Sequence, residues 1–115
     1  MLRLQSAKDI ERVWREGRSH AHPLAVLITC PRLAEGGVAL PPTRCGFVAG
    51  KKVGSAVARN RAKRLLREAV RSRPEAVTVG WDLVFVARPR LAKATLHQAQ
   101  IAVSQLLKRA NVVHL

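Results

Sequence analysis

The chain has 115 residues and is strongly basic, with 21 lysines and arginines against 7 aspartates and glutamates and a formal net charge of +14. Hydrophobic residues make up 48% of it, which excludes a disordered basic tail and suffices for one core. The longest apolar run, residues 24–30, is too short to cross a bilayer, and the first residues lack the apolar stretch of a secretion signal. We therefore expect a single cytoplasmic domain over residues 1–115 whose partner is anionic.

The first predicted element is a helix over residues 7–16. Ser6 precedes it and, with Asp9 three residues later, forms a variant of the capping box. Gly17 follows, and we expect it to end the helix in a left-handed conformation. The apolar residues of this helix repeat at helical spacing at Ile10, Val13 and Trp14.

Two apolar runs, residues 24–29 and 45–49, are too short for helices and are predicted as strands. Residues 19–22 are predicted as a short additional edge strand. The linker between the two apolar runs is typical of a surface hairpin loop. Its glycines and prolines are Pro31, Gly36, Gly37, Pro41 and Pro42.

Residues 51–71 contain a predicted basic helix, and Gly50 and Gly54 bracket the turn that leads into it. The order of glycine, lysine and serine differs from that of a nucleotide-binding P-loop, which excludes that site. One apolar stripe is expected to face the core at Ala58, Ala62, Leu65, Leu66 and Ala69. The opposite side carries Asn60, Lys63, Arg64, Arg67 and Arg71, with Arg59 and Arg61 on its flanks.

This concentration of positive charge favours a polyanion as the partner of the basic helix. Nine basic residues between Lys51 and Arg73 face a single carboxylate, Glu68. A face of mixed charges would be read as merely solvated, whereas a face of one sign attracts phosphates and releases counterions. Nucleic acid is favoured over a membrane because the apolar stripe is built largely of small alanines.

The remaining residues complete a small α+β fold. Residues 81–87 form an apolar run with one acid, Asp82, and are predicted as a buried strand that Pro89 ends. Thr95 and Gln98 form a capping box for a last helix. The order of elements indicates a two-layer α-β sandwich, with helices against one sheet.

We find no set of residues that supports catalysis or metal binding by the protein itself. Cys30 and Cys45 lack metal-ligand spacing and are expected to be buried, reduced thiols. His20 and His22 have no acidic or cysteine partners at ligand spacing, which argues against zinc. With 7 acidic residues and no nucleophile beside a base, the expected work of the chain is binding.

The basic segment resembles the signature of the bacterial ribonuclease P protein subunit. The resemblance rests on Lys-Lys-Val-Gly at 51–54, on the triplet Arg59-Asn60-Arg61 and on the basic residues after it. It extends to residues 9–19, 44–47 and 81–89. The family fold that it implies is an α-β sandwich in the order αβββαβα, with about four strands and a left-handed βαβ crossover. General rules alone favour a right-handed crossover.

The same resemblance implies a function. The family's protein subunit pairs with a catalytic RNA, ribonuclease P RNA, to remove the 5′ leader of precursor tRNA. Water activated by Mg²⁺ on the RNA cleaves the phosphodiester, so the protein contributes no catalytic residue and no metal site. No membrane, small-molecule substrate or protein oligomer is implied. The alternative is a ribosomal or other structural RNA-binding protein without a role in tRNA processing.

The resemblance also assigns site residues by position. The RNA-contact set comprises Lys51, Lys52, Arg59, Asn60, Arg61, Lys63, Arg64, Arg67 and Arg71. A cleft for the single-stranded leader, between the first helix and the sheet, comprises Ile10, Trp14, Ile28, Phe47 and Ala49. Ile10 and Ile28 are aliphatic where many members of the family are aromatic. A role for these two as plain core residues therefore stays open.

Overall fold

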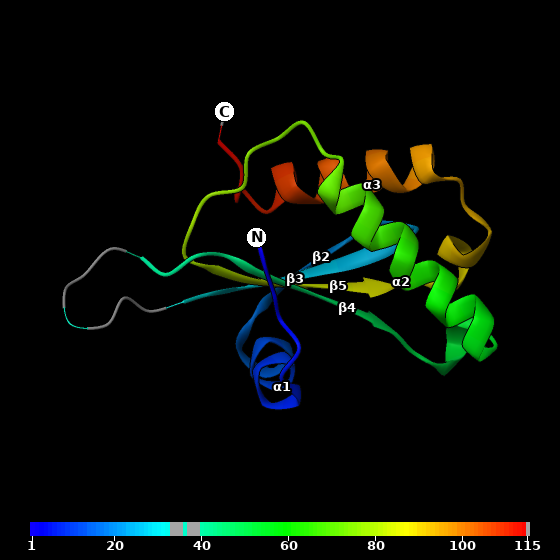
Figure 1. Ribbon diagram of the computed structural model, residues 1–115, viewed down its shortest axis with the longest axis horizontal. Helices are drawn as coiled ribbons and strands as arrows, with labels where there is room; N and C mark the ends of the chain where they lie inside the picture. The colour runs from blue at the N-terminus through cyan, green and yellow to red at the C-terminus, as the bar shows by residue number, and fades with distance from the viewer. Residues whose placement is uncertain (33–35, 37–39, 115) are drawn as a thin grey trace.

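The computed structural model describes residues 1–32, 36 and 40–114. It has an α+β fold of helices packed on one mixed sheet, as the sequence predicted (Figure 1). The last helix begins with the expected capping box, in which Thr95 and Gln98 each accept a hydrogen bond from the other's backbone N–H. The elements are β1 (Leu2–Arg3), α1 (Ala7–Glu16), β2 (Arg18–Ala21), β3 (Ala25–Pro31), β4 (Arg44–Ala49), η1 (Lys51–Val53), α2 (Ala56–Arg71), β5 (Trp81–Ala87), η2 (Pro89–Lys93) and α3 (Leu96–Arg109).

The sheet has five strands in the order β1-β4-β5-β3-β2, one more than the sequence predicted. The additional strand, β1, pairs in parallel with β4 through the N–H groups of Leu2 and Leu4. It was missed because its two residues are exposed and carry no apolar pattern. The predicted hairpin between β3 and β4 is also wrong, because β5 lies between them, antiparallel to β3 and parallel to β4. Part of that linker, residues 33–35 and 37–39, lies outside the described residues.

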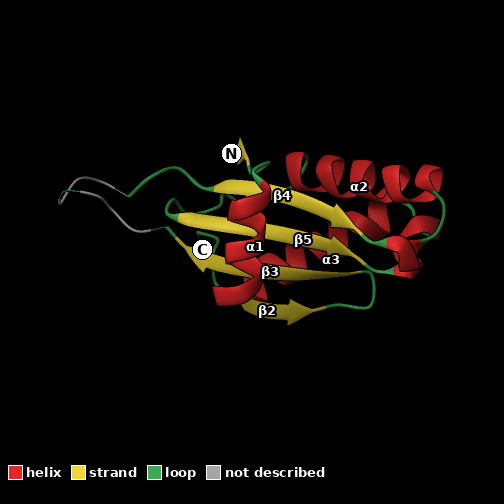
Figure 2. Cartoon of the chain, turned by 90° about the horizontal axis from the view of Figure 1, so that it is seen from below, coloured by secondary structure: helices red, strands yellow, loops and turns green. Residues whose placement is uncertain are grey.

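The crossover from β4 through α2 to β5 is left-handed, as the resemblance implied. In Figure 2 both strands run to the right, β5 lies below β4, and α2 lies behind the sheet. With α2 behind the sheet, a right-handed connection would place β5 above β4 in this view. Right-handed connections are found in about 98% of such units. The consequence is that α2 extends along the β4 edge of the sheet.

The two faces of the sheet are covered by different helices, α2 and α3 on one face and α1 on the other (Figure 1). The larger core lies between the sheet and α2 and α3, where Leu66, Phe85 and Leu106 are fully buried. A smaller core lies under α1, which covers only part of the opposite face; it consists of Leu4, Val13, Ile28, Cys30 and Val84. None of the helices in the described part of the chain is long and apolar enough to span a membrane.

Helix α1 has the predicted bounds but ends differently from the prediction. Its first turn is capped by Ser6, whose hydroxyl accepts a hydrogen bond from the N–H of Asp9. Gly17 is extended, with φ of −80°, so the left-handed cap is wrong. Glycine is required there for space: a Cβ would lie 2.6 Å from the Ile28 side chain, 2.9 Å from the Thr29 carbonyl oxygen, and against the Val13 carbonyl.

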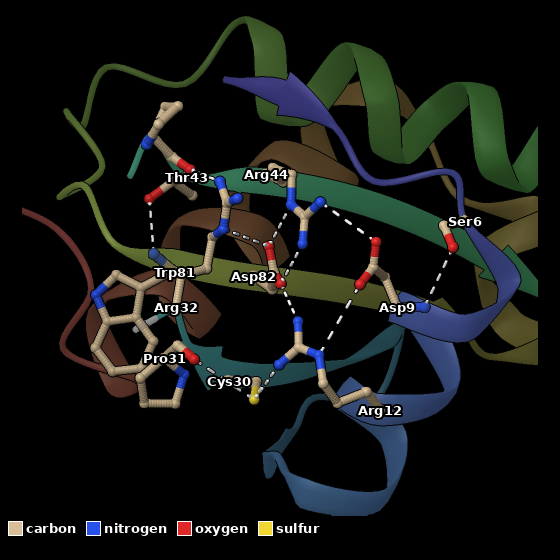
Figure 3. Close-up of polar contacts among 11 residues, drawn as sticks. Ser6, Asp9, Arg12, Cys30, Pro31, Arg32, Thr43, Arg44, Trp81 and Asp82 are labelled. Carbon is tan, nitrogen blue, oxygen red and sulfur yellow. Dashed lines mark hydrogen bonds and ion pairs between the residues drawn. The ribbon is translucent and has the colours of Figure 1, made fainter. Parts of the chain in front are cut away.

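A buried carboxylate ties α1 to three strands (Figure 3). Asp82, at the start of β5, has no solvent-exposed surface. Arg44 of β4 donates to both of its oxygens at 2.8 Å, and Arg12 of α1 donates to one of them. Arg32 lies 3.7 Å away after β3, and Arg44 also reaches Asp9 on α1 at 3.3 Å. The helix is therefore held to the sheet by charge as well as by its small core.

The arginines keep Asp82 ionised. Burial alone would raise the pKa of its carboxyl group, but the hydrogen bonds and charges of Arg44, and then of Arg12, outweigh burial and lower the pKa below its ordinary value of 3.8. Arg12 also donates to the sulfur of Cys30. Each group thus has a partner, as a buried ionic cluster requires.

We expect Gly17→Ala to destabilise the fold by about 3 kcal/mol, because the new methyl group meets two backbone carbonyls that cannot move aside. Urea unfolding measures this loss. Gly50→Ala is the matched control, since a Cβ on Gly50 meets nothing within 4 Å, and it should change stability by less than about 0.5 kcal/mol. Equal stability of the two variants would contradict the packing argument.

Asp82→Asn should lower the unfolding free energy at neutral pH by about 3 kcal/mol, because three guanidinium groups lose their carboxylate. Since the folded-state pKa of Asp82 is lowered below 3.8, its contribution is complete above the ordinary pKa of the unfolded chain and is lost as the pH falls from there through the folded-state pKa. The difference between wild type and variant should therefore narrow in acid. Urea unfolding from pH 7 to pH 2.5 tests this. Glu11→Gln, at an exposed residue with no ion pair among those described, is the control.

Candidate nucleic-acid interface

The basic helix begins at a glycine whose conformation other residues rarely adopt. Gly54 has φ of +136°, and it joins η1 to the helix at an angle that a side chain would strain. Ser55 then caps α2 by accepting a hydrogen bond from the N–H of Ala58. Lys51 and Lys52 of η1 are both exposed, immediately before the start of the helix.

Helix α2 presents opposite faces to the core and to solvent, as predicted. Its fully or nearly buried residues are Ala62, Leu66, Ala69 and Val70, whereas Leu65 and Ala58 are half-buried. The opposite side is exposed and includes Asn60, Arg64, Arg67 and Arg71. Their spacings of four, three and four residues place these four on one stripe, which we call the α2 ridge. Arg59 and Lys63 are half-buried on one flank of it.

Little of the charge on the α2 ridge is neutralised within the protein. Arg71 pairs with Glu68 at 2.5 Å, and this is the one ion pair of the ridge among the residues that the structure describes. Arg67 lies over the ring of Phe47, with its guanidinium carbon 5.9 Å from the ring centre. Arg64 has neither kind of partner in the described part of the chain. The ridge is therefore available to phosphates.

Arg61 differs from the other predicted contact residues because its guanidinium points into the protein. It donates to the backbone carbonyls of Ala92, at the end of η2, and Ala94, the latter at 3.1 Å. These bonds join α2 to the segment between β5 and α3. The structure thus gives Arg61 a stabilising role, which helical spacing alone did not distinguish from RNA contact.

Further cations lie near the entry of α2 and were missed by the sequence analysis. Because η1 and η2 pack together, Lys51 and Lys52 come close to the η2 segment. Arg88, Arg90 and Lys93 in and before η2 are exposed. The basic residues around Pro89 could have been recognised in the sequence as a second cationic cluster. Only the packing of η1 against η2 shows that this cluster lies near residues 51–52.

The five residues predicted to line one leader cleft are divided between the two faces of the sheet. Ile10 is half-buried on α1, and Trp14 is 52% exposed there. Ile28 is 5% exposed and belongs to the small core under α1, so the core alternative is correct for it. Phe47 and Ala49 pack on the opposite face, against the core of α2 and α3. The single cleft of all five residues is therefore wrong.

The sheet face beside α1 is instead formed by valines that the sequence analysis did not select. Val26 pairs with Val86, and Val86 pairs with Val48, so the three form a row across β3, β5 and β4. All three are half-buried and, like Ile10, pack against the small core under α1. This could have been predicted from the alternation of side chains along β4, because Phe47 and Val48 must face opposite sides of the sheet.

The cysteines are free and buried, as expected. Burial raises the pKa of the Cys45 thiol to about 12, so it stays protonated at neutral pH. Among the residues that the structure describes, no group of three His, Cys, Asp or Glu side chains is placed to hold a metal ion.

Comparison with known proteins agrees with this geometry. The family model described as Ribonuclease P matches residues 1–111. The chain belongs to the ribonuclease P protein family. The ribonuclease P protein component of Herpetosiphon aurantiacus is 42% identical over 112 residues, which cover 97% of this chain and 86% of that protein. That of Roseiflexus castenholzii is 40% identical, over 96% and 87% of the two chains. This membership implies a role in maturing the 5′ ends of tRNA.

Solved ribonuclease P proteins share the fold. The protein from Staphylococcus aureus superposes with a TM-score of 0.81 at 29% identity, covering 99% of both chains. The protein from Thermotoga maritima superposes with a TM-score of 0.76 at 26% identity, covering 95% of this chain and 97% of its own. Nearly all of the chain therefore shares one known architecture.

Arg61→Ala should lower the unfolding free energy by about 2 kcal/mol, because two carbonyls between β5 and α3 lose a charged donor. Arg64→Ala is the matched control. It removes the same charge at an exposed position one turn further along the helix, and it should change the unfolding free energy by less than about 0.5 kcal/mol. Urea unfolding of both variants separates the roles. An Arg61→Ala protein as stable as wild type would contradict the anchoring role.

Proposed function

We propose that the chain is the protein subunit of ribonuclease P and binds the catalytic RNA through the α2 ridge. The observation that carries the proposal is the stripe of Asn60, Arg64, Arg67 and Arg71, held rigid by the buried side of α2. The planar guanidinium group donates two parallel hydrogen bonds to a phosphate, and Asn60 can donate to or accept from a 2′-hydroxyl or a base edge. Lys51, Lys52, Arg59 and Lys63 extend this surface.

The 5′ leader of precursor tRNA is proposed to bind on the other face of the sheet, beside α1. Exposed Trp14 offers a ring on which a base can stack, and the valine row of Val26, Val48 and Val86 offers an apolar floor. Arg88 and Arg90 lie past the end of β5, near the same strand ends. Aliphatic contacts read no hydrogen-bond pattern, so leader sequence should matter little to binding.

Catalysis is assigned to the RNA with its Mg²⁺ ions. Two acidic residues on the α1 side of the sheet, Asp9 and Asp82, are occupied by Arg12 and Arg44, and Glu11, which lies beside Ile10 and Trp14, has no second carboxylate in that lining. A carboxylate held by guanidinium groups is a poor metal ligand and a poor general base. The protein is thus proposed to position two RNAs, and a second protein chain is not required.

Added to ribonuclease P RNA and precursor tRNA at low Mg²⁺, the wild-type protein should accelerate leader removal and should cleave nothing by itself. The double variant Arg64→Ala/Arg67→Ala should lose at least about tenfold in affinity for the RNA. Each charged hydrogen bond from a guanidinium to a phosphate contributes roughly 1.5 kcal/mol or more to the binding free energy. Gel-shift titration and the rate of leader release measure the two effects.

The matched control is Arg18→Ala/Lys108→Ala, which removes the same charge at exposed positions on β2 and α3. It should retain binding and acceleration to within about twofold. If the wild-type protein leaves the RNA-alone rate unchanged, the proposed function is wrong, and a structural RNA-binding role replaces it.

A further inference from the structure

A hollow of about 540 Å³ opens between β1 and α2, on the side of β4 opposite α1. Its floor is apolar and includes Cys45 and Phe47 of β4 and Val70 of α2. Cavities of roughly 300–1,000 Å³ are typical of sites for small molecules or single residues of a larger ligand. We call it the β1–α2 hollow.

The rim of the β1–α2 hollow is strongly cationic. Five arginines and one glutamate line it, which leaves a formal charge of +4. The glutamate, Glu68, is occupied by Arg71. The arginines of the rim are Arg3, Arg64, Arg67, Arg71 and Arg73.

Several of these guanidinium groups lack partners within the described residues. Arg3, Arg64 and Arg67 form no ion pair there. Arg73 donates through one terminal nitrogen to the carbonyl of Val70, but its Nε is buried and has no hydrogen-bond partner. Unmet donors around a concave site favour an anion that brings several acceptor oxygens.

The floor adds an aromatic platform to this charge. The ring of Phe47 is stacked on that of Phe85, with centroids 6.0 Å apart and planes 15° from parallel. Phe85 is fully buried on the neighbouring strand, where it pairs with Phe47, so it fixes the orientation of the Phe47 ring. Above the ring lies the guanidinium of Arg67, on an exposed and therefore movable side chain. A nucleobase can stack on Phe47 in the place that this guanidinium now takes.

We propose that the β1–α2 hollow binds one unpaired nucleotide of ribonuclease P RNA, with its base on Phe47 and its phosphate between Arg3 and the arginines of α2. This inference rests on the function proposed above. The nucleotide must be unpaired, because a paired base in a helix keeps both faces stacked on its neighbours. The RNA subunit is its source, because Arg64, Arg67 and Arg71 of the rim belong to the α2 ridge, whereas the proposed leader surface lies across the sheet.

Two substitutions separate the base contact from the phosphate contact. Phe47→Leu keeps an apolar side chain but removes the ring, so affinity for the RNA subunit should fall about tenfold or more with the salt dependence unchanged. Arg3→Ala should weaken binding and also reduce the slope of log affinity against log salt by about one. Arg18→Ala, at an exposed position on β2 at the edge of the sheet opposite β1, is the control and should do neither.

Chemical probing of the reconstituted holoenzyme supplies the decisive readout. Wild-type protein should protect one unpaired nucleotide of the RNA that becomes reactive with Phe47→Leu and with Arg3→Ala, while the protections due to the α2 ridge persist. Arg3 is exposed on β1 and contributes nothing to the core, so this variant stays informative even if Phe47→Leu folds poorly.

Two results would overturn the inference. In the first, both variants bind the RNA subunit within twofold of wild type and every protection remains. In the second, they weaken only the complex with leader-bearing precursor tRNA, which would assign the hollow to the leader. Either result can occur while wild-type protein still accelerates leader removal, so failure of this inference is distinct from failure of the proposed function.

Discussion

The carboxylate of Asp82 is the constraint on which the arrangement of this molecule depends. A charge without solvent contact is stable only if it is fully paired, and here its partners come from α1, from β4 and from the end of β3. Since these partners are far apart in sequence, one interaction fixes the helix relative to three strands. Helix α1 has only a small core beneath it, so the ionic cluster determines where it crosses the sheet and how much of the valine row stays uncovered.

The two faces of the sheet consequently have different chemistry. The face under α2 and α3 holds most of the buried apolar surface and supports the rigid α2 ridge. The face under α1 is held by ion pairs and leaves apolar side chains partly open. Because β5 is the central strand and Asp82 lies at its start, a strand that contributes Leu83, Phe85 and Ala87 to the larger core also anchors the helix of the opposite layer.

Local patterns in the sequence were sufficient for the helices and for every strand except β1, and insufficient for the pairing of the strands. The bounds of α1 and β5 followed from a capping serine and an apolar run, and the buried side of α2 followed from helical spacing. Nothing in an apolar run says which strand lies beside it, so the placement of β5 between β3 and β4 was not predictable. Gly17 illustrates the same limit, because its role is a close approach to residues 28 and 29 in another element.

The candidate site shows the same division. The stripe of Asn60, Arg64, Arg67 and Arg71 could be predicted because it depends on one helix only. The inward turn of Arg61 depends on two carbonyls some thirty residues later in the chain. Likewise, the separation of Phe47 from Ile28 depends on which faces of β4 and β3 coincide in the sheet.

The strands at the two margins of the sheet have a consequence for self-association. An open strand edge offers unpaired N–H and C=O groups to another copy of the chain, and short or charged edge strands discourage such pairing. Here β1 has two residues and carries Arg3, and β2 has four residues and carries Arg18. Two copies that approached edge to edge would bring like charges together over few hydrogen bonds. The apolar central strands are thereby shielded from edge-to-edge polymerisation.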